Sequence, residues 1–415
     1  MGLYGADVAQ LRAAAAELDR SADRLGSART ELTAQLTRTP WTGQDAASFR
    51  TSWNASHAPR LNAAADRLRE AAAVLRRNAD AQETTSAAAG GATAIPGIAG
   101  GTGPVGAPAS DSPDDVRQWW TGLTEQQRHD LVTRDPLRYG NLDGIPVEDR
   151  VDANRLTAED RLTESGLSAA ERSYLEAVVR GDRNLALYDP AGERLVEMIG
   201  TFGPQTTNVL TYVPGTGTNM DSFYGGSAQT VATYLTDRDK SGDTVSFVYK
   251  DGPWADWTFF GPHGTANEGY VLDAGKGLAE FTTSVQSDPA LGGNVSFSAA
   301  GHSAGISYVS ASEVAGAHYD NVLSLAGSWL APGWQADPGT NYQHYQYGVD
   351  ALNYLTPVKN MPIENDVFAE HVYAPDTFEI LGVTFQNEAE NHTHIAQGEA
   401  TNQNALNDMY KDMHR

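Results

Sequence analysis

Residues 294–316 read NVSFSAAGHSAGISYVSASEVAG, and this segment carries the strongest signal for the fold class. Asn294–Ala299 is a short run typical of a β-strand, and it leads into Gly301-His302-Ser303-Ala304-Gly305. The helical stretch Ile306–Gly316 follows. A strand, a G-x-S-x-G turn and a helix in succession are typical of a nucleophile elbow, in which glycines relieve clashes and a strained serine is exposed. Ser303 is therefore the predicted nucleophile. The alternative is an ordinary glycine-rich turn that contains a serine.

The region around this turn alternates short apolar runs with helical stretches. Such alternation predicts βαβ units and a parallel sheet with helices on both faces. The strand-like runs are Asn208–Val213, Thr244–Tyr249, Asn294–Ala299, Asn321–Leu325 and Tyr342–Gly348, and the helical stretches include Ala228–Leu235, Leu272–Val285 and Ile306–Gly316. The predicted fold class is a doubly wound, mostly parallel α/β-hydrolase sheet. We expect the domain at residues 113–415, with a helical extension at 113–200 and the catalytic core at 201–415.

Residues 1–83 differ in composition and predict an all-α antiparallel hairpin. Apolar residues recur at alternating three- and four-residue steps from Val8 to Leu36 and again from Leu61 to Leu75, which is the pattern of an apolar stripe on a helix. Pro40 and Gly43 interrupt the helical pattern between the two series. Residues 84–112 are small, rich in glycine and proline and without apolar periodicity, so they predict a flexible linker.

A serine nucleophile needs an imidazole base and a carboxylate that orients it. In α/β-hydrolases the order along the chain is serine, acid, histidine. His392 is the predicted base and His394 the alternative, because both lie in a polar segment that is expected to form a loop before a terminal helix. Asp350 directly follows the run Tyr342–Gly348 and is the predicted acid, with Asp366 as the alternative.

Substrate contacts are expected from two loops. The run Asn208–Val213 ends in a glycine-rich turn, and backbone N–H groups of Gly215, Thr216 and Ala304 are the predicted oxyanion hole. Aromatic residues gather in a loop bounded by glycine and proline, which predicts either a pocket wall for an apolar acyl group or a structural plug. The predicted substrate-binding residues are Trp254, Trp257, Phe260 and, beside the nucleophile, His302.

The charge and the composition exclude several classes of function. The chain carries 53 Asp and Glu against 29 Lys and Arg, a net charge of −24, and no Cys. Nucleic acids and anionic lipid surfaces need clustered basic residues, so neither is an expected partner. The absence of Cys excludes disulfides, thiolate catalysis and Cys-based metal sites. We expect no cofactor and no metal ion, the weighed alternatives being a His392/His394 metal pair and calcium in the acidic turn Asp237–Asp243.

The usual targeting signals are missing from the sequence. The sequence contains no run of eighteen apolar residues, so it predicts no membrane-spanning helix. The N-terminus lacks the basic segment followed by an apolar segment that is typical of a signal peptide. Taken alone, these features predict a cytoplasmic protein.

Two resemblances extend these predictions. Trp41-Thr42-Gly43 between two Ala- and Leu-rich helices resembles the W-x-G hairpins that type VII (ESX) secretion systems export. The remainder resembles an actinobacterial α/β-hydrolase family through Trp119-Trp120, Gly140–Arg155, Tyr188–Gly192, Val213–Thr218, Gly301–Gly305 and Asn391-His392. The second resemblance implies a triad of Ser303, Asp350 and His392, and the first implies export without a signal peptide.

The predicted function is therefore that of a serine hydrolase, esterase- or lipase-like, acting on a small ester or lipid-like substrate. One alternative is an amidase or peptidase with the same triad. Another is a non-catalytic interaction protein on a degenerate hydrolase scaffold. Residues 1–83 are expected to pair with a helical-bundle partner or with a second copy of the chain. Secretion by the type VII-like route is expected, with the cytoplasm as the alternative.

Overall fold

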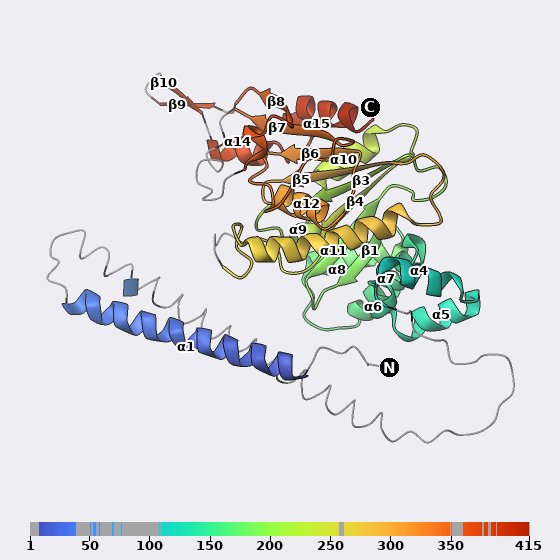
Figure 1. The fold of residues 1–415 in the computed structure, drawn as a ribbon, viewed down its shortest axis with the longest axis horizontal. Helices are drawn as coiled ribbons and strands as arrows, with labels where there is room; N and C mark the ends of the chain where they lie inside the picture. Colours follow the sequence, from blue (N-terminus) through green and yellow to red (C-terminus); the bar gives the residue numbers. More distant parts are fainter. Residues whose placement is uncertain are drawn as a thin grey trace. The chain divides into compact units, whose positions relative to one another are not determined.

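The structure is a computed structural model of the 415-residue chain. It describes residues 8–38, 110–256, 261–348, 350, 360–375, 377–380, 383–386 and 388–414, together with residues 50, 53, 54, 58, 69, 76 and 108. The chain divides into two compact units, Met1–Gly101 and Thr102–Arg415 (Figure 1). The turn at residues 41–43, the apolar series from residue 61 to 75 and most of the predicted linker lie outside the described residues. Among the described helices, none is long and apolar enough to cross a lipid bilayer.

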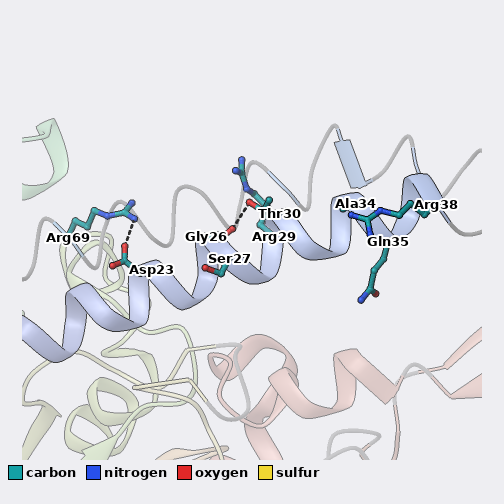
Figure 2. Close-up of a pocket in the computed structure, with 9 residues that line it drawn as sticks. All are labelled: Asp23, Gly26, Ser27, Arg29, Thr30, Ala34, Gln35, Arg38 and Arg69. Atoms are coloured by element: carbon teal, nitrogen blue, oxygen red, sulfur yellow. Dashed lines mark hydrogen bonds and ion pairs between the residues drawn. The ribbon is translucent and has the colours of Figure 1, made fainter.

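The first unit contains helix α1, Val8–Arg38, which spans the whole first apolar series. Later residues of the unit contact this helix in a regular order. The contacts are Arg50 Nε to Leu36 O at 3.1 Å, Trp53 Nε1 to Thr33 Oγ1 at 3.0 Å, Arg69 Nη2 to Asp23 Oδ1 at 3.1 Å (Figure 2), and Arg76 to Asp19. As the residue number rises from Arg50 to Arg76, the number of the contacted residue on α1 falls from Leu36 to Asp19. This is the order of contacts in an antiparallel hairpin.

The second unit begins with short helices, α4 (Pro113–Thr121), α5 (Glu125–Arg134), α6 (Pro136–Tyr139), α7 (Val147–Leu162) and α8 (Ala169–Arg180). The side chain of Ser168 caps α8 by accepting a hydrogen bond from Glu171 N, and Gly181 ends the helix in the left-handed region with φ 82°. The helical extension thus ends at Arg180. The prediction that it continues to residue 200 is wrong, because two strands occupy that segment.

An eight-stranded sheet forms the centre of this unit, in the order β1-β2-β4-β3-β5-β6-β7-β8. The strands are β1 (Asn184–Asp189), β2 (Arg194–Ile199), β3 (Asn208–Val213), β4 (Thr244–Lys250), β5 (Ser296–His302), β6 (Asn321–Leu325), β7 (Asn341–Tyr347) and β8 (Ala369–Tyr373). β2 pairs antiparallel with both β1 and β4, whereas every pair from β4 to β8 is parallel. A separate hairpin of β9 (Thr377–Ile380) and β10 (Val383–Gln386) follows. The carboxyl ends of the parallel strands therefore meet at one edge.

Helices cover both faces of the sheet (Figure 1). One core includes apolar residues of α11 (Glu268–Gln286) and α12 (Gly305–Val314). The other includes residues of α8, α10 (Thr230–Arg238) and α15 (Glu399–Met413). Two shorter helices, α9 (Met220–Tyr224) and α14 (Glu388–His394), follow β3 and β10. The predicted α/β-hydrolase fold, a mostly parallel sheet between two helical layers, is confirmed.

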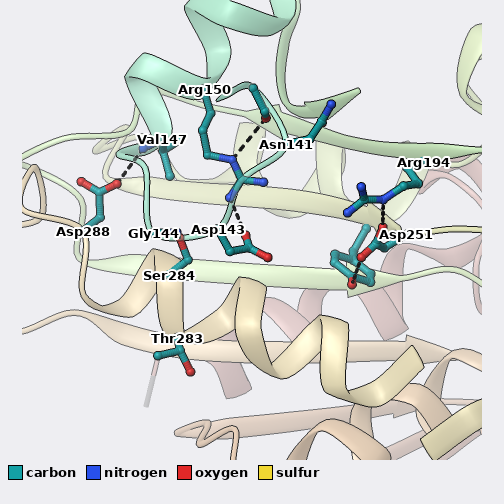
Figure 3. A network of polar contacts seen from close by, with 12 residues as sticks. Asn141, Asp143, Gly144, Val147, Arg150, Arg194, Asp251, Thr283, Ser284 and Asp288 are labelled. Atoms are coloured by element: carbon teal, nitrogen blue, oxygen red, sulfur yellow. Dashed lines mark hydrogen bonds and ion pairs between the residues drawn. The ribbon is translucent and has the colours of Figure 1, made fainter. Parts of the chain in front are cut away.

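The segment Gly140–Arg155 fastens the helical extension to the α11 region (Figure 3). Its backbone N–H groups at Gly144 and Val147 donate to Ser284 Oγ and Asp288 Oδ2 of the α11 region, each at 2.7 Å. The guanidinium of Arg150, fully buried, donates to Asp143 Oδ1 at 2.6 Å. These contacts explain the segment as a structural connection between α6–α7 and the α11 region.

Candidate active site

Ser303 lies on the sharp turn between β5 and α12. Its φ of 53° places a non-glycine residue in the left-handed region, which is strained for a residue with a Cβ. Its backbone N–H donates to Leu325 O at 2.9 Å, and its carbonyl accepts from the N–H and the Oγ of Ser328 at 3.1 and 3.2 Å. The main chain on both sides of the serine is therefore held by β6 and the residues after it. Strand β5 runs on to His302, three residues beyond the predicted end, and carries Ser303 to the carboxyl edge of the sheet.

The elbow requires its two glycines. A Cβ on Gly301 would lie 2.4 Å from Ile306 N, and a Cβ on Gly305 would lie 2.1 Å from Val213 O. Both distances are too short for any side chain. The G-x-S-x-G pattern thus lets α12 start directly behind Ser303 and pack against the end of β3.

The loop after β3 lies against Ser303. A Cβ on Gly215 would lie 3.1 Å from the Cβ of Ser303 and 2.7 Å from Nδ1 of His302. Among the described residues, the backbone N–H groups of Thr216 and Ala304 have no hydrogen-bond acceptor. Two free donors thus belong to the segments that adjoin Ser303, as an oxyanion hole would require.

His392 and Asp350 form a buried pair. The Nδ1 atom of His392 and Oδ2 of Asp350 lie 2.5 Å apart, and the two side chains are only 5% and 1% exposed. Asp350 follows the end of β7, and His392 belongs to α14 rather than to the loop that the sequence predicts. An imidazole that donates through Nδ1 to a carboxylate keeps Nε2 free to accept a proton.

The alternative residues have different surroundings. His394 is stacked on the ring of Tyr347, with ring centroids 4.1 Å apart, and its Nε2 lies 2.7 Å from Thr401 O. These contacts fasten α14 to β7 and to the start of α15. Asp366 is exposed and makes no described contact with either histidine. The structure therefore brings His392, not His394, to Asp350.

His302 connects the elbow to this pair. Its Nε2 lies 3.1 Å from the carbonyl oxygen of His392, and the centroids of the two rings are 5.3 Å apart. Because His302 precedes Ser303 in the chain, this contact places α14 beside Ser303. Desolvation of the enclosed ring, followed by the influence of His392, lowers the pKa of His302 to about 4.

The predicted aromatic wall is described only in part. Trp254 is 7% exposed, stacks on Tyr308 with ring centroids 4.6 Å apart, and donates its indole N–H to Pro214 O at 3.0 Å. The N–H of Gly217 donates to Ala255 O at 2.7 Å. Trp254 and its neighbour thus hold the Gly215 loop in place. Trp257 and Phe260 lie outside the described residues.

A polar chain under the site was missed at the level of sequence. Oγ of Ser324 lies 2.9 Å from Nδ1 of His344, and Nε2 of His344 lies 3.1 Å from Oε1 of Gln346. Gln346 then donates to Gly348 O at 3.0 Å, two residues before Asp350. The polar residues His344 and Gln346, which alternate with Tyr345 and Tyr347 in β7, were the available signal.

No set of three or more His, Asp or Glu side chains in the described part of the chain is arranged to hold a metal ion. The acidic turn after α10 instead binds its own residues, because the N–H of Ser241 donates to Asp239 Oδ1 at 3.0 Å and its Oγ to Asp243 Oδ1 at 2.8 Å.

Comparisons with known proteins give short or distant similarities. No protein-family model matches the chain. Over 47 residues it is 45% identical to uncharacterized proteins from two strains of Mycobacterium tuberculosis, and the match covers 11% of this chain and 7% of each relative.

Similar solved structures include a carboxylesterase from Mesorhizobium loti (11% identity, TM-score 0.31, 44% of this chain and 85% of that one). A dienelactone hydrolase-like promiscuous phosphotriesterase from metagenomic libraries is 14% identical, with a TM-score of 0.30 and coverage of 55% and 94%. A lipase-esterase related protein from Clostridium acetobutylicum is 18% identical, with a TM-score of 0.20 and coverage of 32% and 47%. The chemistry of the site is therefore inferred from the geometry of its own residues.

Proposed function

We propose that this chain is a serine hydrolase that cleaves carboxylic esters, with Ser303 as nucleophile, His392 as base and Asp350 as the acid that orients the base. The observation that carries the proposal is the buried pair of His392 and Asp350, 2.5 Å apart, in which His392 belongs to a helix that contacts the residue next to Ser303. Acyl transfer requires a strained serine, an oriented imidazole and free backbone donors, and here they belong to segments at the carboxyl edge of the sheet.

In the proposed reaction, the Oγ of Ser303 attacks the ester carbonyl while its proton passes to Nε2 of His392. Asp350 accepts the hydrogen bond from Nδ1 of the resulting imidazolium and stabilises its charge. The carbonyl oxygen becomes an oxyanion that the N–H groups of Thr216 and Ala304 stabilise. The C–O bond to the alcohol then breaks, and His392 returns the proton to the departing oxygen. Water repeats the sequence on the acyl-serine and releases the carboxylic acid and free Ser303.

The proposal is tested with a fluorophosphonate probe, which reacts covalently with activated serines. The wild type should be labelled and Ser303→Ala should not. Ser227→Ala is the matched control, because Ser227 is exposed and outside the site. Equal labelling of wild type and Ser303→Ala would refute the proposal.

Ester preference needs its own comparison. A p-nitrophenyl ester and the p-nitroanilide of the same short acyl group should be offered to the wild type and to Ser303→Ala. We expect Ser303-dependent release from the ester and at most slow release from the anilide. Faster cleavage of the anilide would replace the esterase with an amidase that uses the same residues.

We also propose that residues 1–83 direct export through a type VII-like route, as a hairpin that pairs with a helical partner or a second copy. Support comes from α1 and from its contacts with residues 50–76, which follow antiparallel order. The test is expression of the full chain in a host with such a system, with Trp41→Ala as the variant. Wild-type protein in the culture medium and retention of the variant would agree; retention of both would contradict export.

A further inference from the structure

His302 occupies a position between three parts of the proposed site. It ends β5, it precedes the nucleophile, and its ring lies between the Gly215 loop and α14. The sequence suggested a contact with substrate. The described contacts of its ring instead go to the protein.

Each ring nitrogen faces a different element. Nε2 lies 3.1 Å from the carbonyl oxygen of His392. Nδ1 faces Gly215 so closely that a Cβ there would be 2.7 Å away. A carbonyl oxygen only accepts hydrogen bonds, so the ring carries its proton on Nε2. His302 thus donates to the backbone of the residue whose side chain is the proposed base.

The charge state of His302 fits this role. With its pKa lowered to about 4, the ring is neutral in the range where an esterase works. A neutral donor fixes the backbone of His392 without placing a second positive charge beside the imidazolium that forms during attack.

We propose that His302 is a positioning residue that holds the backbone of His392, so that the base is anchored at its carbonyl by His302 and at its Nδ1 by Asp350. This inference rests on the proposed function. Two anchors, one on the main chain and one on the ring, define the direction of Nε2 better than either alone. Displacement of a catalytic group by about 1 Å can lower a rate by roughly 100-fold, so loss of one anchor should have a measurable effect.

The test compares His302→Gln, whose side-chain amide keeps an N–H donor, with His302→Leu, which removes it. His318→Gln is the matched control, because the side chain of His318 is 61% exposed and pairs with Asp337 outside the site. For a series of p-nitrophenyl esters, we expect kcat of His302→Leu to fall roughly 10- to 100-fold. KM should stay within about two-fold and the loss should be the same for every acyl length, because positioning affects the chemical step. His302→Gln should recover most of the rate.

A KM that rises selectively with one acyl group would mean that His302 contacts substrate and would overturn the proposal. Equal losses in both variants would mean that the donor is irrelevant and would also overturn it. The resting protein gives a second readout, the low-field NMR signal of the proton between His392 and Asp350. It should broaden in His302→Leu and persist in His302→Gln. An unchanged signal in both variants contradicts the positioning role, whereas absence of probe labelling in the wild type contradicts the proposed function itself.

Discussion

The Nδ1 atom of His392 lies 2.5 Å from Oδ2 of Asp350, although the two residues are 42 positions apart in the chain. One side chain comes from a short helix and the other from the end of a strand, and both are almost fully buried. Burial of an imidazole and a carboxylate is favourable only when each satisfies the other. The contact therefore fixes the ring orientation of His392 as well as its tautomer.

Replacement of the proposed acid tests this relationship directly. In Asp350→Asn, the amide can donate to Nδ1 and thereby favour the wrong tautomer of His392, so kcat should fall roughly 10³- to 10⁴-fold. Asp366→Asn removes the exposed alternative acid and should leave kcat unchanged. The rates of ester hydrolysis by the two purified variants show whether Asp350 or Asp366 is the acid. Loss of activity in Asp366→Asn alone would assign the acid to Asp366.

The sequence predicted the elbow because everything that defines it is local. Ser303, its two glycines and the flanking strand and helix lie within 21 residues, from Ser296 to Gly316. Strands β3 and β6 begin and end as predicted for the same reason, since each is a short local run rich in apolar residues. The antiparallel strand β2 escaped prediction because Glu197 interrupts its apolar pattern. That carboxylate is buried and satisfied by Arg183 at 2.5 Å and by the hydroxyl of Tyr174 at 2.7 Å, partners that no local pattern supplies.

The choice between His392 and His394 also depended on packing. Two residues apart on a helix, their side chains leave in different directions. His392 contacts Asp350, whereas His394 contacts Tyr347 and Thr401. The role of Trp254 was equally hidden, because its hydrogen bond to Pro214 joins residues 40 positions apart.

A second prediction concerns Gly305, the glycine behind the proposed nucleophile Ser303. In Gly305→Ala, the added methyl group would lie 2.1 Å from Val213 O and 3.0 Å from Pro214 O, so the backbone must move. We expect a loss of about 1–3 kcal/mol in unfolding free energy and a loss of esterase activity. Gly293→Ala is the control, since a Cβ there meets nothing within 4 Å. Urea unfolding curves measure the unfolding free energy of both variants. Equal stability of Gly305→Ala and Gly293→Ala would disprove the clash.

A third prediction concerns pH and Glu313 on α12. Its carboxylate accepts hydrogen bonds from the Tyr342 hydroxyl at 2.6 Å and from the Trp334 indole at 2.7 Å. Burial nevertheless raises the pKa of Glu313 from 4.5 to about 7, because it outweighs these two bonds. The folded chain then holds this proton more tightly than the unfolded chain. The contribution to stability is complete below about pH 4.5 and is lost as the pH rises through about 7.

Glu313→Gln cannot ionise and should lack this pH dependence. Relative to the wild type, its unfolding free energy should rise between pH 4.5 and 8 by on the order of 2 kcal/mol. The exposed Glu159→Gln provides the control and should follow the wild type at each pH. Chemical unfolding at four or five pH values gives the comparison. A constant difference between Glu313→Gln and the wild type would show that Glu313 does not titrate in this range.

The last prediction concerns the outer edge of the sheet at β1. Oδ1 of Asn141 accepts from Tyr188 N at 2.7 Å, and its Nδ2 donates to Tyr188 O at 2.9 Å. The amide of Asn141 thus pairs with β1 as one residue of a neighbouring strand would. Tyr188 is fully buried, so in Asn141→Ala its backbone groups lose partners that water cannot replace. We expect a loss of roughly 1–3 kcal/mol in unfolding free energy.

Asn141→Asp separates the two hydrogen bonds. A carboxylate still accepts from Tyr188 N but places negative charge against Tyr188 O, so this variant should be at least as unstable as Asn141→Ala. Asn294→Ala, at an exposed position, should change stability by no more than about 0.5 kcal/mol. Because an unpaired strand edge favours association between chains, light scattering near the unfolding midpoint should also rise earlier in both Asn141 variants than in Asn294→Ala. Wild-type stability in Asn141→Ala would mean that the edge of β1 needs no partner.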